Sequence, residues 1–373
     1  MHTRKHSRPR LLSCIENNSK DRELCVSLGR RETRMKFLGV EFAPVNIPFE
    51  RRLQTLAVFQ WVLSFLFLGF GCLLLSVYLL FTRFYFISLA YLVWYLADRK
   101  TSARGSRRIL WVQRWKVWEY FRDYFPIHLV KTAQLDPKKN YILSIHPHGV
   151  LSTSAFLNFA TQATDFRGKF PGIEANLMVL PGHFSFPFYR EYFMSTGAVE
   201  SNKESMEWLL THRGTGNAVC LITGGALEAL EASPGKYVVK LKNRKGFVKM
   251  ALKYGACLVP VLSFGETDLY LQASNPDNSL LKRVQVTCTK YMGFSPPLFH
   301  GRGIFNYTFG LLPFRKPVYT VVGSPIDVEK VDNPSQEDIN ELHTTYLDAL
   351  VELFKQNKTK CGVDESVDIH IVE

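Results

Sequence analysis

Two apolar runs near the start of the chain interrupt its otherwise mixed pattern of polar and hydrophobic positions. The first, from Leu56 to Phe81, contains no charged residue, and a helix that spans a bilayer needs about 20 such residues. The second, Phe84 to Ala97, follows directly after Arg83, a residue that is costly at mid-membrane but tolerated at an interface. We therefore expect residues 40–98 to form a membrane-embedded helical hairpin, with either two full spans or one span and a re-entrant segment. One long helix buried in a soluble core is the alternative interpretation.

The charges around these runs predict the orientation of the hairpin. Arg51 and Arg52 precede the first run, and Arg99 and Lys100 follow the second. Because positive residues favour the cytoplasmic side of a membrane, we expect both ends of the hairpin in the cytosol. Residues 1–39 are rich in Arg and Lys and lack the apolar core of a signal peptide. We interpret them as a disordered basic cytosolic tail.

A segment rich in tryptophan and arginine, residues 107–125, follows the second run. Trp111, Trp115 and Trp118 alternate there with basic residues, a combination typical of a helix that lies in the headgroup layer. We expect this segment to be interfacial and to open a cytosolic domain that covers residues 99–373. An ordinary amphipathic helix on the surface of that domain is the alternative.

Short apolar runs alternate with helix-like segments in the rest of the chain. This alternation is typical of an α/β domain with a largely parallel sheet, whose active site is expected at the carboxyl ends of the strands. A helix is expected to begin at Ser335, since Ile339, Leu342, Tyr346 and Leu350 recur at helical spacing. The predicted strands are 141–145, 217–222, 256–264 and 317–322, and the predicted helices between them are 152–163, 203–211 and 246–254.

Composition and charge narrow the classes of function. The net charge is +13 and the sequence contains 28 phenylalanines. An excess of positive charge fits nucleic acid, an anionic lipid surface or an anionic substrate. The chain has no nucleic-acid-binding motif, so we expect no nucleic-acid partner and retain the other two. It has neither the G-x-S-x-G turn of a serine hydrolase nor a phosphate-binding P-loop.

The first candidate for chemistry is the sequence His146-Pro147-His148-Gly149, directly after a predicted strand. Histidine can act as a general base near neutral pH, and Gly149 allows close approach of the backbone to a ligand. The N–H groups at the start of the following helix could hold an oxyanion. Two alternatives remain: histidines bound to the backbone of the turn, and a zinc site completed by His183, His128 or His300.

Two further candidates follow later strands. Gly224 and Gly225 form a tight turn that would place Glu228 at the edge of the sheet, although a loop with a solvated glutamate fits as well. Arg244, Lys245 and Gly246 precede a helix in a way that suits phosphate, although an ordinary basic turn fits equally. A strand that ends at Phe264 adds Glu266 to the same edge.

Taken together, the chain resembles the diacylglycerol acyltransferase type 2 family, which includes the monoacylglycerol acyltransferases. The resemblance runs from about Val40 to the end of the chain. Val40–Pro44 and Ser201–Ser205 look most like the monoacylglycerol branch, whereas Thr223 stands where Val or Leu is usual. The motifs that carry the resemblance are Arg51–Thr55, Asp123–Pro126, His146–Gly149, Phe170–Gly172, Arg190–Tyr192, Gly224–Ala226 with Glu228–Ala229, Arg244–Phe247, Leu258–Glu266 and His300–Gly303.

The resemblance implies an α/β acyltransferase domain with a mixed sheet like that of the glycerophosphate acyltransferases, anchored by the N-terminal hairpin. It implies a multi-pass protein of the endoplasmic reticulum membrane, also found at lipid droplets, with acyl-CoA as donor, mono- or diacylglycerol as acceptor and no metal or other cofactor. A homo-oligomer is left open.

The family also suggests roles for residues. His148 takes the role of the base in preference to His146, although we expect both histidines to be catalytic residues. From the candidate motifs described above, we expect the substrate-binding residues to be Gly149, Gly224, Gly225, Glu228, Arg244, Lys245, Gly246 and Glu266. The aspartate that follows the catalytic histidine in glycerophosphate acyltransferases is missing here, so the residue that orients His148 stays open. A wax-alcohol or retinol acyltransferase is the alternative enzyme, and a non-catalytic lipid-binding membrane protein is the alternative from another class.

Overall fold

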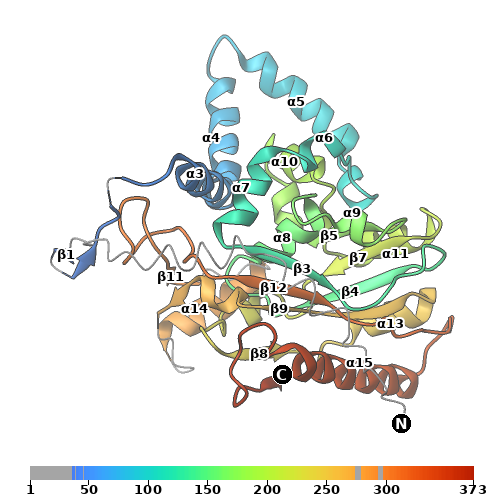
Figure 1. The fold of residues 1–373 in the computed structure, drawn as a ribbon. Helices are drawn as coiled ribbons and strands as arrows, with labels where there is room; N and C mark the ends of the chain where they lie inside the picture. The colour runs from blue at the N-terminus through green and yellow to red at the C-terminus, as the bar shows by residue number, and fades with distance from the viewer. Residues whose placement is uncertain (1–35, 38, 45, 274–278, 293–296) are drawn as a thin grey trace.

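A seven-stranded mixed sheet forms the centre of the protein (Figure 1). This computed structural model describes residues 36–373 except 38, 45, 274–278 and 293–296. The strand order is β3-β12-β9-β4-β7-β5-β6. The strands are β3 (Ile127–Lys131), β4 (Tyr141–His146), β5 (Glu174–Val179), β6 (Val199–Glu200), β7 (Asn217–Leu221), β9 (Cys257–Phe264) and β12 (Val318–Val322).

Five neighbouring strands, from β9 to β6, run parallel to one another, and β12 pairs antiparallel with β9 and parallel with β3. The predicted α/β class is therefore confirmed as a mixed sheet, and the four predicted strands are present to within one residue at each end. Strands β3, β5 and β6 were not predicted. The carboxyl ends of β9, β4 and β7 lie side by side, which is where ligands bind in open parallel sheets.

Two hydrophobic cores lie on opposite faces of this sheet. On one face pack α3 (Phe49–Leu63), α7 (Lys116–Tyr124), α8 (Thr153–Ala160) and α10 (Tyr189–Ser195). On the other pack α11 (Lys203–Thr211), α13 (Gly246–Tyr254) and α15 (Gln336–Asn357). The predicted bounds of α11 and α13 are confirmed. The Ser335 hydroxyl accepts the Asp338 amide at the start of α15, and this capping box confirms the predicted beginning of that helix.

Phe49–Leu80 is a continuous helix that is long and apolar enough to cross a membrane. It includes a π-helical segment, Ser64–Leu68, and continues as α4 (Gly69–Leu80). Its first half is buried against the domain, with Val58 and Trp61 inaccessible to solvent, whereas most large side chains of α4 and of α5 (Tyr85–Asp98) are exposed. These two helices project together from the domain (Figure 1). The Ser88 hydroxyl donates to the Ser76 carbonyl at 2.8 Å and ties them to each other.

Two predicted segments differ in part from the structure. Residues 1–35 of the predicted tail lie outside the described residues, but Lys36–Phe37 pairs with Val40–Glu41 as a short antiparallel ribbon, so the prediction of disorder is wrong for those last residues. In the aromatic segment, Trp118 is buried and its indole N–H donates to the Val112 carbonyl at 2.8 Å, whereas Trp111 is exposed. Helix α7 therefore belongs to the domain core, because its aromatic stripe packs on α3.

Shorter elements complete the described chain. Strand β8 lies beside the C-terminal strand β13 in a separate parallel pair. The remaining elements are β1 (Lys36–Phe37), β2 (Val40–Glu41), η2 (Thr101–Ala103), α6 (Leu110–Gln113), α9 (Phe166–Lys169), η3 (Pro181–Phe184), α12 (Gly225–Ala229), β8 (Tyr237–Lys240), η4 (Glu266–Leu269), β10 (Leu271–Gln272), α14 (Leu280–Met292), β11 (Phe299–His300) and β13 (Ile369–Val372).

Candidate active site

The ends of three neighbouring strands bring most of the predicted site residues together. Strand β4 ends at His146 and leads into the turn that carries His148. Beside it, β7 leads to Gly224 and Gly225 at the start of α12, and β9 leads to Glu266. The expectation of a site at the carboxyl edge of the sheet is therefore matched by the position of these residues.

The imidazole of His148 is fixed by its own turn. Its Nδ1 lies 2.9 Å from the Gly149 carbonyl oxygen and 3.2 Å from the Ser152 hydroxyl. A carbonyl can only accept a hydrogen bond, so Nδ1 must carry the proton and Nε2 the lone pair. Burial lowers the pKa of His148, which keeps the ring neutral and basic near neutral pH. The orienting group that the sequence left open is thus the Gly149 carbonyl, supported by Ser152.

His146 has a different environment. It is completely buried, and its Nε2 lies 2.9 Å from the Ser144 hydroxyl and 3.1 Å from the Tyr346 hydroxyl of α15. The Thr223 hydroxyl also contacts Ser144. Burial lowers the pKa of His146 to about 3. The predicted catalytic role for His146 is therefore not supported by its position, because an enclosed ring bound on Nε2 cannot reach a substrate.

Glu228 is buried beneath the histidine turn instead of being solvated. One carboxylate oxygen accepts the His148 amide at 2.6 Å, and the other accepts the Lys240 amide of β8 at 2.8 Å. Burial raises the pKa of Glu228 to about 7, although both amide donors lower it. Gly224 is required beside it, since a Cβ there would lie 1.9 Å from the carboxylate. Glu228 therefore couples the position of His148 to β8.

Glu266 is also held by hydrogen bonds within the protein, so its carboxylate is not free to bind a ligand. Its two carboxylate oxygens accept the amides of Thr153 and Ser154 at 2.7 and 2.9 Å. The expectation that the start of α8 holds an oxyanion is consequently wrong, because a carboxylate already binds there. The Gly149 amide makes no hydrogen bond within the described residues and is a donor directly next to His148.

An apolar cavity of about 240 Å³ opens beside His148. Its walls come from both the sheet edge and the long N-terminal helix, which contributes Trp61, Phe65 and Leu66. Gly225, from the second predicted motif, also lines it. The long apolar helix Phe49–Leu80 and the His148 imidazole thus line the same cavity. We call this space the histidine cavity.

Sequence reasoning did not identify His183 as part of this cavity. It lies on η3, its ring stacks on Phe193 at 4.8 Å, and burial lowers its pKa to about 4. The other histidines considered for zinc are elsewhere: His128 of the edge strand β3 stacks on Tyr319 of β12, and His300 is in β11. Across the described residues, no three His, Cys, Asp or Glu side chains form a metal-binding group.

The third predicted motif lies at the start of α13. Gly246 lines a second cavity, described below, and the Lys245 ammonium group donates to the Asn340 side chain at 2.7 Å. The positive charge of Arg244 lowers the pKa of the buried Glu228 carboxyl. Neither Arg244 nor Lys245 lines the histidine cavity or this second cavity.

Comparison with known proteins finds relatives that match most of the chain. The chain is 51% identical over 329 residues to 2-acylglycerol O-acyltransferase 1 of Bos taurus, which covers 88% of this chain and 98% of the relative. It is 48% identical over 318 residues to Diacylglycerol O-acyltransferase 2 of Homo sapiens, or 85% of this chain and 82% of the relative. A crystal structure of 1-acyl-sn-glycerophosphate acyltransferase, PlsC, from Thermotoga maritima aligns with a TM-score of 0.37 and 12% identity over 82% of this chain and 97% of that one.

The family model for diacylglycerol acyltransferase matches residues 77–372. This range includes the histidine turn, the turn at Gly224 and Gly225, and every strand of the central sheet. Together with an identity of about one half over most of the chain, the match establishes that the chain belongs to the diacylglycerol acyltransferase family.

Proposed function

We propose that the protein is an acyl-CoA-dependent O-acyltransferase that makes diacylglycerol from monoacylglycerol, and that it can also acylate diacylglycerol. The observation that carries this proposal is the His148 imidazole, held on Nδ1 with its Nε2 lone pair free, at the wall of an apolar cavity. A general base next to a lipid-sized apolar space suits the hydroxyl of a neutral glycerolipid. The names of the relatives, 2-acylglycerol and diacylglycerol O-acyltransferase, support the same reaction.

In the proposed mechanism, His148 Nε2 takes the proton of the acceptor hydroxyl as its oxygen attacks the thioester carbonyl. The Gly149 amide donates to the oxyanion of the tetrahedral intermediate. The carbon–sulfur bond then breaks, CoA leaves as a thiolate, and the imidazolium returns its proton to the sulfur. Glu228 and Glu266 act as positioning residues, since their carboxylates hold the turn and the start of α8.

The acceptor reaches His148 from the bilayer in this proposal. Phe65 and Leu66, which line the histidine cavity, belong to the π-helical segment just before the exposed helix α4. The exposed apolar surface of α4 and α5 is typical of contact with lipid. At 1.5 Å per residue, the 12 residues of α4 and 14 of α5 extend about 20 Å, less than the roughly 30 Å of a hydrocarbon core.

We place both ends of this hairpin on the cytosolic side of the endoplasmic reticulum membrane. A glycosylation acceptor inserted at Thr82–Phe84 tests its depth, because only a tip exposed to the lumen would be modified. Modification at the tip would support two full spans, and its absence, with the inserted acceptor modified in a lumenal control protein, would support a hairpin that enters without crossing.

The activity is tested in membranes that lack their own neutral-lipid synthesis. Labelled oleoyl-CoA is supplied with 2-monoacylglycerol, diacylglycerol or a long-chain alcohol, and the wild type is compared with His148→Ala and with His370→Ala, a change at an exposed histidine of β13. We expect label in diacylglycerol that is lost only in the His148 variant. Label only in triacylglycerol or wax would correct the acceptor, and no label with any acceptor would favour a non-catalytic lipid-binding protein.

A further inference from the structure

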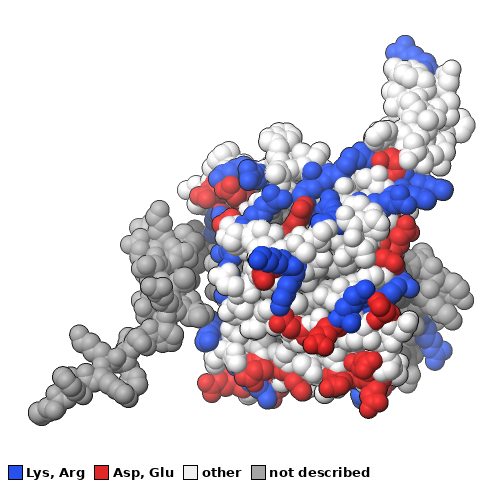
Figure 2. All heavy atoms as spheres, turned by 90° about the vertical axis from the view of Figure 1, so that its right-hand side faces the viewer, with Lys and Arg blue, Asp and Glu red and all other residues white. Residues whose placement is uncertain are grey.

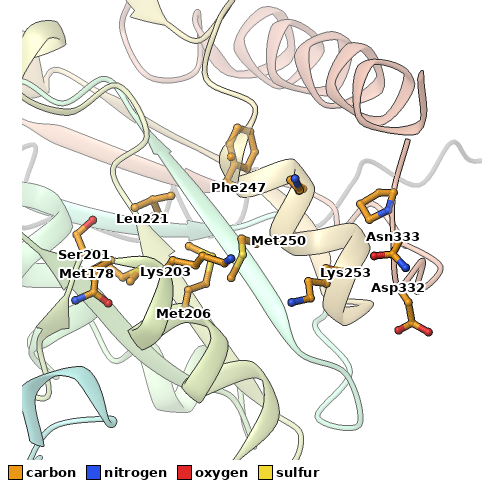
Figure 3. Close-up of a pocket in the computed structure, with 14 residues that line it drawn as sticks. Met178, Ser201, Lys203, Met206, Leu221, Phe247, Met250, Lys253, Asp332 and Asn333 are labelled. Atoms are coloured by element: carbon orange, nitrogen blue, oxygen red, sulfur yellow. The ribbon is translucent and has the colours of Figure 1, made fainter. Parts of the chain in front are cut away.

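A second cavity lies on the other side of the sheet edge and has a different chemical character. It encloses about 740 Å³ between α11 and α13 (Figure 3). Lys203 at the start of α11 and Lys249 and Lys253 of α13 line it. In Figure 3, Lys203 extends toward Met250 of α13. We call this space the lysine groove.

The lysine groove carries three ammonium groups and a single carboxylate among the residues that line it. Among the described residues, Lys203, Lys249 and Lys253 form no ion pair, although the Lys253 ammonium group lies over the Tyr254 ring at 5.0 Å from its centroid and is also influenced by the charges of Glu207 and Asp332. Asp332 also lines the groove but pairs with Lys330 at 2.9 Å. Over the side of the molecule seen in Figure 2, Lys and Arg gather toward the projecting helices, while Asp and Glu follow the opposite edge. Three ammonium groups around one concave space favour the binding of a polyanion.

The two cavities share a wall. Met178, at the end of β5, and Ser201, just after β6, line both the histidine cavity and the lysine groove. Leu221 and Phe247 continue the apolar surface of the groove between this wall and the lysines. A ligand that occupied both spaces would therefore need an anionic end, an uncharged extended middle and an end that reaches His148.

The start of α13 adds to the positive potential. Gly246, its first residue, lines the groove, and the N-terminus of a helix carries a partial positive charge. In contrast, the Lys245 side chain is engaged by Asn340 outside the groove. Arg244 does not line the groove. The phosphate-binding role expected for Arg244 and Lys245 thus fits the positions of the three groove lysines better.

We propose that the lysine groove binds the phosphates of the acyl-CoA donor, and that the pantetheine arm crosses the shared wall at Met178 and Ser201 to present the thioester to His148. This proposal rests on the proposed function, because acyl-CoA is the donor in both. Acyl-CoA and a phospholipid both carry a phosphate group on an extended molecule, so either could bind positive charge in this groove. The experiment therefore separates these two sources of phosphate.

The test uses a triple variant, Lys203→Ala with Lys249→Ala and Lys253→Ala, in full-length protein. We expect its KM for oleoyl-CoA to rise at least about tenfold, the scale of losing one charge-assisted hydrogen bond, while kcat changes little. The corresponding Lys→Arg triple should keep the wild-type KM because the charges remain. Lys138, Lys355 and Lys360 are exposed and line neither cavity, so their triple change to Ala is the matched control.

A comparison with Arg244→Ala/Lys245→Ala decides between the two basic clusters. If this double variant raises the KM for oleoyl-CoA and the groove triple does not, the phosphates bind at the start of α13 and the proposal is overturned. Reduced binding of the groove triple to vesicles that contain phosphatidate, with unchanged CoA binding, would identify a headgroup site and would also overturn it.

Direct binding separates failure of the groove from failure of the proposed function. Free CoA is titrated into the His148→Ala protein in detergent, with and without the groove substitutions. Loss of CoA binding on substitution supports the groove even if the wild type transfers no acyl group to any acceptor. Unchanged CoA binding on substitution would show that the phosphates bind elsewhere, whether or not the wild type transfers an acyl group.

Discussion

The two sides of the turn from His146 to Gly149 place identical rings, two residues apart, in opposite environments. On the inner side, His146 is enclosed by Ser144 and by Tyr346, which reaches it from the C-terminal helix. On the outer side, His148 is held by its own backbone and faces the histidine cavity. The difference shows that two histidines of one motif can have separate surroundings: one ring is enclosed in a buried hydrogen-bond network, and the other lies at a cavity wall, where we propose that it transfers a proton.

The largest expected effect is on the outer side. His148→Ala should lower the rate of acyl transfer by at least about 10²-fold, the usual scale for loss of a general base, with little change in folding. The measurement is the initial rate of diacylglycerol formation in membranes, normalised to the amount of folded protein. A folded His148→Ala protein with the wild-type rate would show that His148 is not the general base.

Glu228→Gln should affect both sides, since Glu228 holds the turn itself. A glutamine can accept only one of the His148 and Lys240 amides and turns its own N–H₂ toward the other. We expect the free energy of unfolding to fall by about 1–3 kcal/mol, the cost of an unsatisfied buried donor, together with a clear loss of rate. Thermal unfolding in detergent and the rate assay measure both, with Glu329→Gln at an exposed position as control. Wild-type stability and rate would show that the turn does not depend on this carboxylate.

The pH dependence of the rate should report on His148, and the pH dependence of stability should report on His146. Burial lowers the pKa of His148 below its ordinary 6.5, so the neutral base persists as pH falls and the acid limb of kcat/KM should lie below pH 6.5. His146, with a pKa of about 3 in the folded state against 6.5 when unfolded, gives a different signal. Its contribution to stability is complete above pH 6.5 and is lost as pH falls from 6.5 toward 3.

An acid limb near pH 7 would assign the controlling ionisation to Glu228, whose pKa is about 7. In that case Glu228→Gln would remove the limb. A limb below pH 6.5 that persists in Glu228→Gln would instead support His148.

The smallest expected effect comes from Tyr346→Phe on the inner side. The change removes a hydroxyl that contacts His146 and donates to the Ser144 carbonyl. We expect the free energy of unfolding to fall by about 1 kcal/mol and the rate to stay within about threefold of wild type, as for one neutral hydrogen bond. A loss of rate as large as that of His148→Ala, in protein that stays folded, would mean that the buried network takes part in the chemistry.

Local sequence patterns predicted most of the elements that flank the site. Helices α11 and α13 and the strand ends near His146 follow from periodic apolar positions and glycine turns, which act over a few residues. Strand β5 was missed because its buried Asn176 interrupts the apolar pattern, and this polar residue is satisfied by contacts such as that from Arg108. Such a contact between distant segments leaves no periodic signal.

Contacts between distant segments also limit how much of the site can be predicted from the sequence. The motif indicated that His146 and His148 matter, but their different roles depend on Tyr346, 200 residues away. Glu228 and Glu266 were identified as site residues, yet their partners are backbone amides of other segments, which carry no sequence signature. The groove lysines were missed because Lys203 and Lys249 come from helices that meet only in the folded chain.

Gly149 has a consequence for how this sequence can change over generations. Its φ is +61°, and a Cβ there would lie 2.6 Å from Cγ of Glu266, a side chain anchored by two amides. Every amino acid that one nucleotide change can reach from a glycine codon carries a Cβ. No single nucleotide change therefore replaces Gly149 by another amino acid without this clash. A second substitution, at Glu266, would relieve the clash only by removing the carboxylate that holds the start of α8.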